Sequence, residues 1–235
     1  MIKSFLKILN KLREKVQYLY LKKIYGDHNS SLKVKIAINK ILKLMPEDGV
    51  GLNIGSGKGN KIDPRIKNME IKNGRGIDYV GSVESIPFND KVFDTIILQE
   101  VLEHVEDPNK AMKEIYRVLK FGGHLYIQVP FIIGFHPCPK DYWRFTHQGI
   151  KEINEKHGFE VVDLGESVGS ATGFYRICVE FFSIILSIFL PFMYRPLKAL
   201  FALLFFPIKF LDSLISFSHQ SKRISGGHFS ISKKV

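Results

Sequence analysis

A glycine-rich turn directly after a predicted strand constrains the fold of this chain more than any other feature. Residues 50–59 read VGLNIGSGKG, so an apolar run leads into glycines at positions 55, 57 and 59. Glycine adopts backbone conformations closed to other residues and lets a ligand approach the main chain. The spacing is G-x-G-x-G, which differs from the G-x-G-x-x-G fingerprint of nicotinamide-dependent oxidoreductases. The turn therefore indicates a binding loop for another ligand, or a tight turn without a ligand.

Short apolar runs alternate with helical stretches from residue 49 onwards. Strands alternating with helices predict a doubly wound α/β domain with a mostly parallel sheet, and we assign residues 46–172 to it. The predicted strands are 50–54, 65–71, 94–98, 125–129 and 159–164, and the predicted helices are 108–119 and 148–156.

The net charge of +11 resides at the two ends of the chain. Residues 1–45 hold 11 Lys/Arg and 2 acids, residues 46–172 hold 15 and 19, and residues 173–235 hold 8 and 2. A nucleic-acid partner is not expected, because the middle of the chain is acidic. Basic ends beside apolar stretches favour a membrane surface instead. Two cysteines are too few for a disulfide framework or a four-cysteine zinc site.

Both ends are predicted to be appendages of the central domain. Residues 1–45 predict two basic amphipathic helices, over 2–25 and from Ser30 or Ser31 to Met45. Residues 173–217 are apolar, but their charge-free stretches are shorter than the roughly 18 residues that a spanning helix needs. They predict a helical hairpin that rests on a membrane, or an interface with a second copy of the chain. Residues 218–235 predict a polar tail.

Three segments resemble the class I S-adenosylmethionine-dependent methyltransferases. They are LNIGSGKG (52–59), GSVESIPF (81–88) and residues 93–131, within a resemblance that spans about 48–165. The similar group includes the ubiquinone- and menaquinone-pathway enzymes, and the nearest likeness is to bacterial members associated with surface polysaccharides. The resemblance implies a Rossmann-like fold, S-adenosylmethionine as cofactor and methyltransferase activity.

The resemblance also implies which residues hold the cofactor. The glycine turn would wrap its amino-acid and ribose parts. A carboxylate at the end of the second strand would accept hydrogen bonds from both ribose hydroxyls. Glu70 is our choice and Asp78 is the alternative. The full predicted set is Asn53, Gly55, Ser56, Gly57, Gly59, Glu70, Ser82, Val83, Gln99 and Glu100.

The chain departs from the family pattern in two places. Ser82 stands where relatives carry an aspartate that accepts from the adenine amino group, so the Ser82 hydroxyl and the Val83 backbone would take that contact. Only a short segment containing Pro64 separates Gly59 from Glu70, so the usual helix after the glycine turn has no room.

The loop after the fifth predicted strand concentrates residues that could act on a substrate. It resembles the H-x-x-P-x-D-Y-x-R-x-T stretch of the surface-polysaccharide-associated relatives. His136 is predicted as general base, Asp141 as its orienter or an alternative base, and Arg144 as the group that grips an anionic substrate. Tyr142 and Trp143 would pack on a sugar ring. The alternative is structural: an Asp141–Arg144 ion pair with two aromatic rings that cap the core.

A metal is considered at Glu100, Glu103 and His104, which one helical turn would bring to one face. Some relatives hold Mg²⁺ with residues at this spacing, and His136 could approach as a fourth ligand. The same residues also occur in members without a metal, so no metal site is favoured.

These features predict an S-adenosylmethionine-dependent methyltransferase that O-methylates a lipid-linked saccharide or another cell-envelope intermediate. Its expected location is the cytoplasmic face of the membrane, with peripheral or monotopic attachment. One alternative acceptor is a quinone-type isoprenoid or aromatic molecule. An alternative of another class is a non-catalytic, membrane-bound binding or scaffold protein on a methyltransferase fold.

Overall fold

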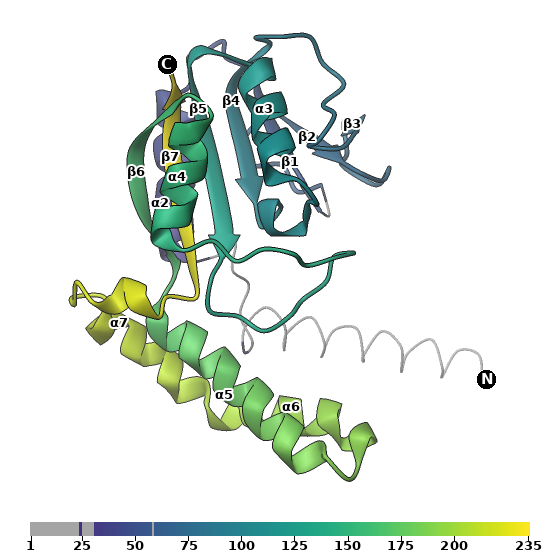
Figure 1. The fold of residues 1–235 in the computed structure, drawn as a ribbon, viewed down its shortest axis with the longest axis vertical. Helices are drawn as coiled ribbons and strands as arrows, with labels where there is room; N and C mark the ends of the chain where they lie inside the picture. Colours follow the sequence, from purple (N-terminus) through teal and green to yellow (C-terminus); the bar gives the residue numbers. More distant parts are fainter. Residues whose placement is uncertain (1–23, 25–30, 58) are drawn as a thin grey trace.

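A seven-stranded sheet forms the centre of the computed structural model, which describes residue 24, residues 31–57 and residues 59–235 (Figure 1). The strand order is β3-β2-β1-β4-β5-β7-β6, with antiparallel pairing only at β7. The predicted doubly wound, mostly parallel α/β fold is confirmed. The strands are β1 (Gly51–Ile54), β2 (Ile66–Glu70), β3 (Tyr79–Val80), β4 (Phe93–Gln99), β5 (Leu119–Pro130), β6 (Phe159–Val168) and β7 (Gly227–Lys234).

Alternate residues of the central strands supply two apolar cores. Ile96 and Leu98 of β4 pack in the cluster beneath α3 (Pro108–Val118) and α4 (His147–Lys156). Ile97 points to the opposite face and packs in the cluster beneath α2 (Leu32–Leu44). This alternation follows from the two-residue repeat of a strand, so one apolar run serves both faces of the sheet.

Three helices begin where a side chain can cap them. Ser31 Oγ accepts from Val34 N at 3.1 Å, and Thr146 Oγ1 accepts from Gly149 N at 3.0 Å. Asp107 caps α3, which begins at Pro108. The predicted helices 31–45, 108–119 and 148–156 are confirmed to within about two residues. The helix predicted over residues 2–25 falls almost entirely outside the described residues.

The prediction of a polar tail over residues 218–235 is wrong at its end. Residues 227–234 form β7, which pairs with β5 on one side and β6 on the other. Ser230 and Ser232 are fully buried, and Lys234 Nζ donates to the carbonyls of Tyr116 and Leu119. The sequence did not predict this strand, because its hydrophobicity is low. Small serines can be buried there, and the backbone is paired with a strand on each side. The central domain therefore includes β7 and extends beyond residues 46–172.

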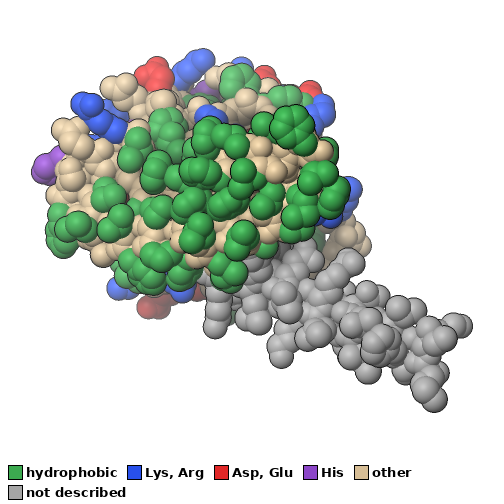
Figure 2. Space-filling view, turned by 90° about the horizontal axis from the view of Figure 1, so that it is seen from below, with side chains coloured by type: hydrophobic (Ala, Val, Ile, Leu, Met, Phe, Trp, Pro, Cys, Tyr) green, Lys and Arg blue, Asp and Glu red, His purple; other side chains and the backbone are tan. Residues whose placement is uncertain are grey.

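The segment between β6 and β7 forms a layer of helices at the edge of the sheet where β4 and β5 end (Figure 1). Tyr175, Val179, Phe201 and Ala202 make its small core. No helix in the described part of the chain is long and apolar enough to cross a membrane. The outward face of the layer is largely apolar (Figure 2). Its elements are α5 (Ser170–Ser187), η4 (Pro191–Met193), α6 (Tyr194–Leu204), η5 (Phe206–Leu211), α7 (Asp212–Ile215) and η6 (Ser221–Arg223).

A buried histidine in β7 predicts a loss of stability in acid. Burial, with a smaller contribution from His147, lowers the pKa of His228 to about 4 from 6.5. The unfolded chain therefore binds this proton at a higher pH than the folded chain does, and the free energy of unfolding falls as pH drops from 6.5 towards 4. We expect His228→Gln to remove about 2 kcal/mol of the stability difference between pH 7.5 and pH 5. Urea unfolding at both pH values measures this, and an unchanged difference in the variant would contradict it.

Candidate functional site

A cavity of about 520 Å³ opens where β1, β2 and β4 end. The carboxyl ends of parallel strands meet at one edge, and ligands of such folds bind there. Its lining comes from five segments of the chain, within residues 54–57, 70–71, 81–84, 99–106 and 136–142. The glycine turn and the loop after β5, which are far apart in the sequence, thus face one cavity.

The glycine turn takes conformations that require glycine. Gly55 and Gly57 line the cavity with φ values of 68° and 59°. A Cβ on Gly55 would lie 2.3 Å from Val101 Cγ2, whereas a Cβ on Gly57 would meet nothing within 4 Å. The space beside Gly57 is open, so a ligand can reach the main chain at this point.

Glu70, the last residue of β2, presents a fixed carboxylate to the cavity. Its Oε2 accepts from Gly57 N at 2.9 Å and its Oε1 accepts from Ile71 N at 2.8 Å. Each oxygen retains a further acceptor site, because a carboxylate oxygen carries two lone pairs. Asp78, the alternative carboxylate, accepts instead from Asn68 N at 2.8 Å and does not line the cavity. The geometry therefore favours Glu70 over Asp78 as the ligand group.

The other predicted cofactor residues divide into two groups. Residues that line the cavity are Ser82, Val83, Gln99 and Glu100. Residues that do not line it are Asn53, Ser56 and Gly59.

Two of the residues outside the lining hold neighbouring chain segments together. Asn53 Nδ2 donates to Asn68 Oδ1 at 3.0 Å, which joins β1 to β2. Gly59 packs so closely that a Cβ would lie 2.4 Å from the carbonyl oxygen of Arg75. The described residues between β1 and β2 contain no helix, as the short spacing to Glu70 predicts.

The chain leaves β4 through a strained residue. Glu100 has a φ of 57°, a conformation that is uncommon without glycine and that occurs often at functional sites. Its Oε1 accepts from Gln128 Nε2 of β5 at 3.1 Å. The turn leads at once into η3 (Leu102–His104), whose last two residues enter the site.

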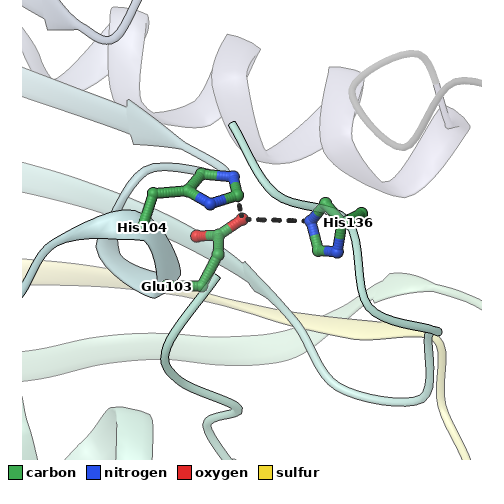
Figure 3. Close-up of side chains that lie close together, drawn as sticks. All are labelled: Glu103, His104 and His136. Carbon is green, nitrogen blue, oxygen red and sulfur yellow. Dashed lines mark ion pairs between the residues drawn. The ribbon is translucent and has the colours of Figure 1, made fainter. Parts of the chain in front are cut away.

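Glu103, His104 and His136 converge at one end of the cavity (Figure 3). Glu103 is fully buried, and its Oε1 lies 3.6 Å from His104 Nε2 and 3.8 Å from His136 Nε2. Both distances exceed an ordinary hydrogen bond. Burial raises the pKa of Glu103, and the nearby Glu103 carboxylate raises the pKa of His136. The charge of Glu103 and the charge of His136 therefore depend on each other.

The hydrogen bond of His104 Nδ1 determines which nitrogen of this ring faces Glu103. His104 Nδ1 lies 2.6 Å from the carbonyl oxygen of Lys140, which can only accept, so Nδ1 carries hydrogen. In the neutral ring, Nε2 then turns a lone pair towards the Glu103 carboxylate. A proton or a cation between the two removes the repulsion. One carboxylate and two imidazoles fit a divalent cation, and a hydrogen bond from the outer nitrogen is usual for a metal-bound histidine.

His136 is oriented by the next acidic residue of its loop. Asp141 Oδ2 accepts from His136 N at 2.8 Å and lies 3.4 Å from His136 Nδ1. Arg144 holds both carboxylate oxygens of Asp141 at 2.6 Å and keeps the pKa of Asp141 at about 2. Asp141 is therefore ionised throughout the physiological range and suits the predicted role of orienter better than that of base.

Arg144 and Trp143 have the structural contacts of the alternative interpretation, whereas Tyr142 lines the cavity. Arg144 does not line the cavity, and it also donates to the carbonyls of Gly134 and Trp143. Trp143 does not line the cavity, and its Nε1 donates to Val105 O at 2.9 Å. Tyr142 does line the cavity, with its hydroxyl donating to Glu106 Oε1 at 2.7 Å.

Several lining residues have no counterpart in the sequence prediction. Lys140 and Glu106 form an ion pair of 2.5 Å at the cavity wall, and Cys138 lies beside them. These residues lie in irregular segments, where no periodicity shows which side chains meet. The sequence shows opposite charges at positions 106 and 140, but their pairing depends on how the loop folds back.

Comparison with known proteins finds a family match for part of this chain. Residues 52–127 match the family model described as a methyltransferase domain. The ubiquinone/menaquinone biosynthesis C-methyltransferase of Pectobacterium atrosepticum is 33% identical over 109 residues, which cover 44% of this chain and 38% of the relative. An uncharacterized protein of Methanocaldococcus jannaschii is 33% identical over 105 residues, covering 40% of this chain and 51% of that protein. The chain thus spans about two fifths to half the length of these relatives.

Solved structures show the same fold at low sequence identity. Phosphoethanolamine N-methyltransferase 2 of Haemonchus contortus, in complex with S-adenosylmethionine, has a TM-score of 0.53 and 17% identity, covering 90% of this chain and 55% of that one. The cyclase SpnF has a TM-score of 0.52 and 18% identity, covering 89% and 84%. Residues 52–127 therefore match a methyltransferase domain, and the fold around them is that of the class I S-adenosylmethionine-dependent methyltransferases.

Proposed function

We propose that this protein transfers a methyl group from S-adenosylmethionine to an amphiphilic acceptor. The observation that carries the proposal is the shared cavity, which joins a fixed carboxylate beside an open glycine turn to a buried Glu–His cluster. Its volume of about 520 Å³ lies within the usual range for small-molecule sites. When bound, S-adenosylmethionine supplies an electrophilic methyl group.

The residues around Glu70 would hold the cofactor. Glu70 offers acceptor lone pairs to the two ribose hydroxyls, while Ser82 and Val83 border the place of the adenine. The open side of Gly57 leaves room for the amino-acid part. Hydrogen bonds to an ionised carboxylate are about twice as strong as neutral ones, so Glu70 should contribute much of the affinity.

His136 would take the proton of an oxygen acceptor. Methylation of a hydroxyl requires removal of its proton in line with the transfer, and the base must lie at the acceptor end of the cavity. His136 lines the cavity, and its Nδ1 lies near Asp141 Oδ2 and the carbonyl of Gly134, so Nε2 would accept the proton. The carboxylates of Glu103 and Asp141 would stabilise the imidazolium that forms, and both raise the pKa of His136, Glu103 more strongly.

A divalent cation is a second candidate for the same cluster. The observation that favours it is the arrangement of Glu103, His104 and His136, whose ligand atoms all lie within 4.8 Å of one another. Glu100, which the sequence placed in the metal set with Glu103 and His104, accepts from Gln128 instead. His136 is the third member of the observed cluster. A cation there would bind and polarise an acceptor oxygen, so no separate base would be required.

The preferred acceptor is a lipid-linked saccharide or another cell-envelope intermediate methylated on oxygen. Support comes from Tyr142, an aromatic ring at the cavity wall, and from the apolar helices beside the site. A quinone-type acceptor is the alternative, and the names of the relatives that act on ubiquinone and menaquinone precursors support it. A non-catalytic binding protein would hold S-adenosylmethionine without transferring its methyl group.

Loss of the Glu70 charge should weaken cofactor binding. We expect Glu70→Gln to raise the Kd for S-adenosylmethionine about tenfold in calorimetric titration, because a charge-assisted acceptor is replaced by a neutral one. Asp78→Asn is the matched control and should leave the Kd within about twofold, since Asp78 does not line the cavity. Equal losses in both variants would contradict the assignment of Glu70.

The mechanism with His136 as base and the mechanism with a divalent cation predict opposite effects of metal removal. With His136 as base, we expect the purified protein to hold less than about 0.1 equivalent of divalent metal and to keep its activity after dialysis against a chelator. His136→Gln should then abolish transfer of tritiated methyl groups to a bacterial lipid extract, with the Kd for S-adenosylmethionine unchanged. A stoichiometric metal, lost together with activity, would replace the base by the cation.

The chemical nature of the labelled product should separate the acceptors. We expect the tritium to become water-soluble when mild acid cleaves the lipid extract, because the labelled oxygen belongs to a saccharide. Label that stays in the organic phase would favour the quinone-type acceptor. Tight cofactor binding without any labelled product would favour the non-catalytic protein.

A further inference from the structure

The outer surface of α5 has the reverse polarity of an ordinary surface helix. Ser183 and Ser187 lie on its buried side, where their hydroxyls donate to the carbonyls of Val179 and Ile184. Large apolar side chains occupy the exposed side at helical spacing, namely Phe174, Ile177, Phe181, Ile184 and Ile188. A helix in contact with water carries its polar side outwards, so the exposed side of α5 is suited to an apolar environment.

This apolar surface continues over the whole helical layer (Figure 2). Eighteen of the 32 exposed large hydrophobic side chains in the described part of the chain lie between residues 174 and 217. Phe189 is 93% exposed and Phe217 is 87% exposed. Scattered apolar residues are normal on a protein surface, but a continuous face of this kind marks an interaction site. We call the outer surface of residues 174–217 the apolar face.

Basic residues outnumber acidic residues in the segment that forms the apolar face. Residues 173–226 contain two acidic residues, Glu180 and Asp212. Glu180 binds Lys198 and Tyr194, and Asp212 accepts from Ala171 N at 2.7 Å and from Thr172. Exposed basic residues at Arg195, Lys222 and Arg223 make no ion pair with a described residue. Figure 2 shows Lys and Arg side chains around the border of the face, with Asp and Glu side chains among them.

We propose that the apolar face docks onto a lipid bilayer that contains anionic lipids. None of its helices is long and apolar enough to cross the bilayer. They would lie in the plane of the headgroups, with phenylalanines in the acyl region and basic residues at the phosphates. Two copies paired through this face would place the basic residues Arg195, Lys222 and Arg223 of both copies at one interface. A bilayer with anionic lipids offers acyl chains to the apolar side chains and phosphate groups to the basic ones.

The docked face would bring the candidate active site to the membrane. The loop after β5 is tied to the helical layer, since Phe131 N and Ile132 N donate to the carbonyls of Gly226 and Ser225. Gly134, two residues before His136, lies against α5, where a Cβ would be 3.7 Å from Glu180 Cγ. This step rests on the proposed function: an acceptor with a membrane-embedded lipid would reach the Glu103–His136 end of the cavity.

Vesicle flotation of the full-length protein tests the docking directly. We expect the protein to float with vesicles of phosphatidylcholine and phosphatidylglycerol, and to float less with pure phosphatidylcholine or in high salt. Phe189→Glu should weaken binding at least about tenfold, because it places a charge in the acyl region. The matched control is Phe121→Glu, which alters an exposed phenylalanine at the opposite end of β5 and should bind like the wild type.

The charge reversal Lys222→Glu with Arg223→Glu should remove the preference for anionic vesicles, while Lys72→Glu with Arg75→Glu should keep it. A stable dimer that ignores vesicles of either composition would overturn the proposal in favour of a second copy. Equal binding by the Phe189→Glu and Phe121→Glu variants would also overturn it. Calorimetric titration of the same samples with S-adenosylmethionine separates these outcomes from failure of the methyltransferase proposal.

Discussion

Burial of the Glu103 carboxylate is the interaction on which the candidate site depends. A lone ionised carboxylate without solvent is costly, so this group needs a proton, a cation or a positively charged side chain close by. His104 and His136 come from different segments and approach it from two sides (Figure 3). The backbone carbonyl of the same residue accepts from the amides of Tyr142 and Trp143 at 2.8 and 3.2 Å. Glu103 thereby fixes both the charge of the site and the path of the loop that carries His136.

The insertion of a helical layer between β6 and β7 links this site to the apolar face. Because β7 returns to the sheet between β5 and β6, both ends of the inserted segment lie near the edge where β5 ends. The layer is therefore held beside the loop after β5, and not attached as a separate tail. A cofactor pocket, a base and a lipid-facing surface can then occupy one edge of the domain.

Local patterns predicted the elements whose signals lie within the element itself. The glycine turn, the apolar runs of β1, β4 and β5, and the start of α2 at Ser31 all depend on neighbouring residues. β7 was missed because its burial comes from strands about 60 and 100 residues earlier in the chain, and its serines resemble a polar tail. The sequence suggested that His136 could approach Glu103 and His104, which the fold bears out, but it could not show that Glu100 binds Gln128.

The central claim is that one cavity holds S-adenosylmethionine between Glu70 and the Glu103–His136 cluster. A crystal structure with S-adenosylhomocysteine tests it most directly. The account predicts both ribose hydroxyls on the Glu70 carboxylate, the adenine beside Ser82 and Val83, and the sulfur directed towards His136. A ligand bound elsewhere, or a ribose on another residue with Glu70 still held only by Gly57 and Ile71, would contradict it.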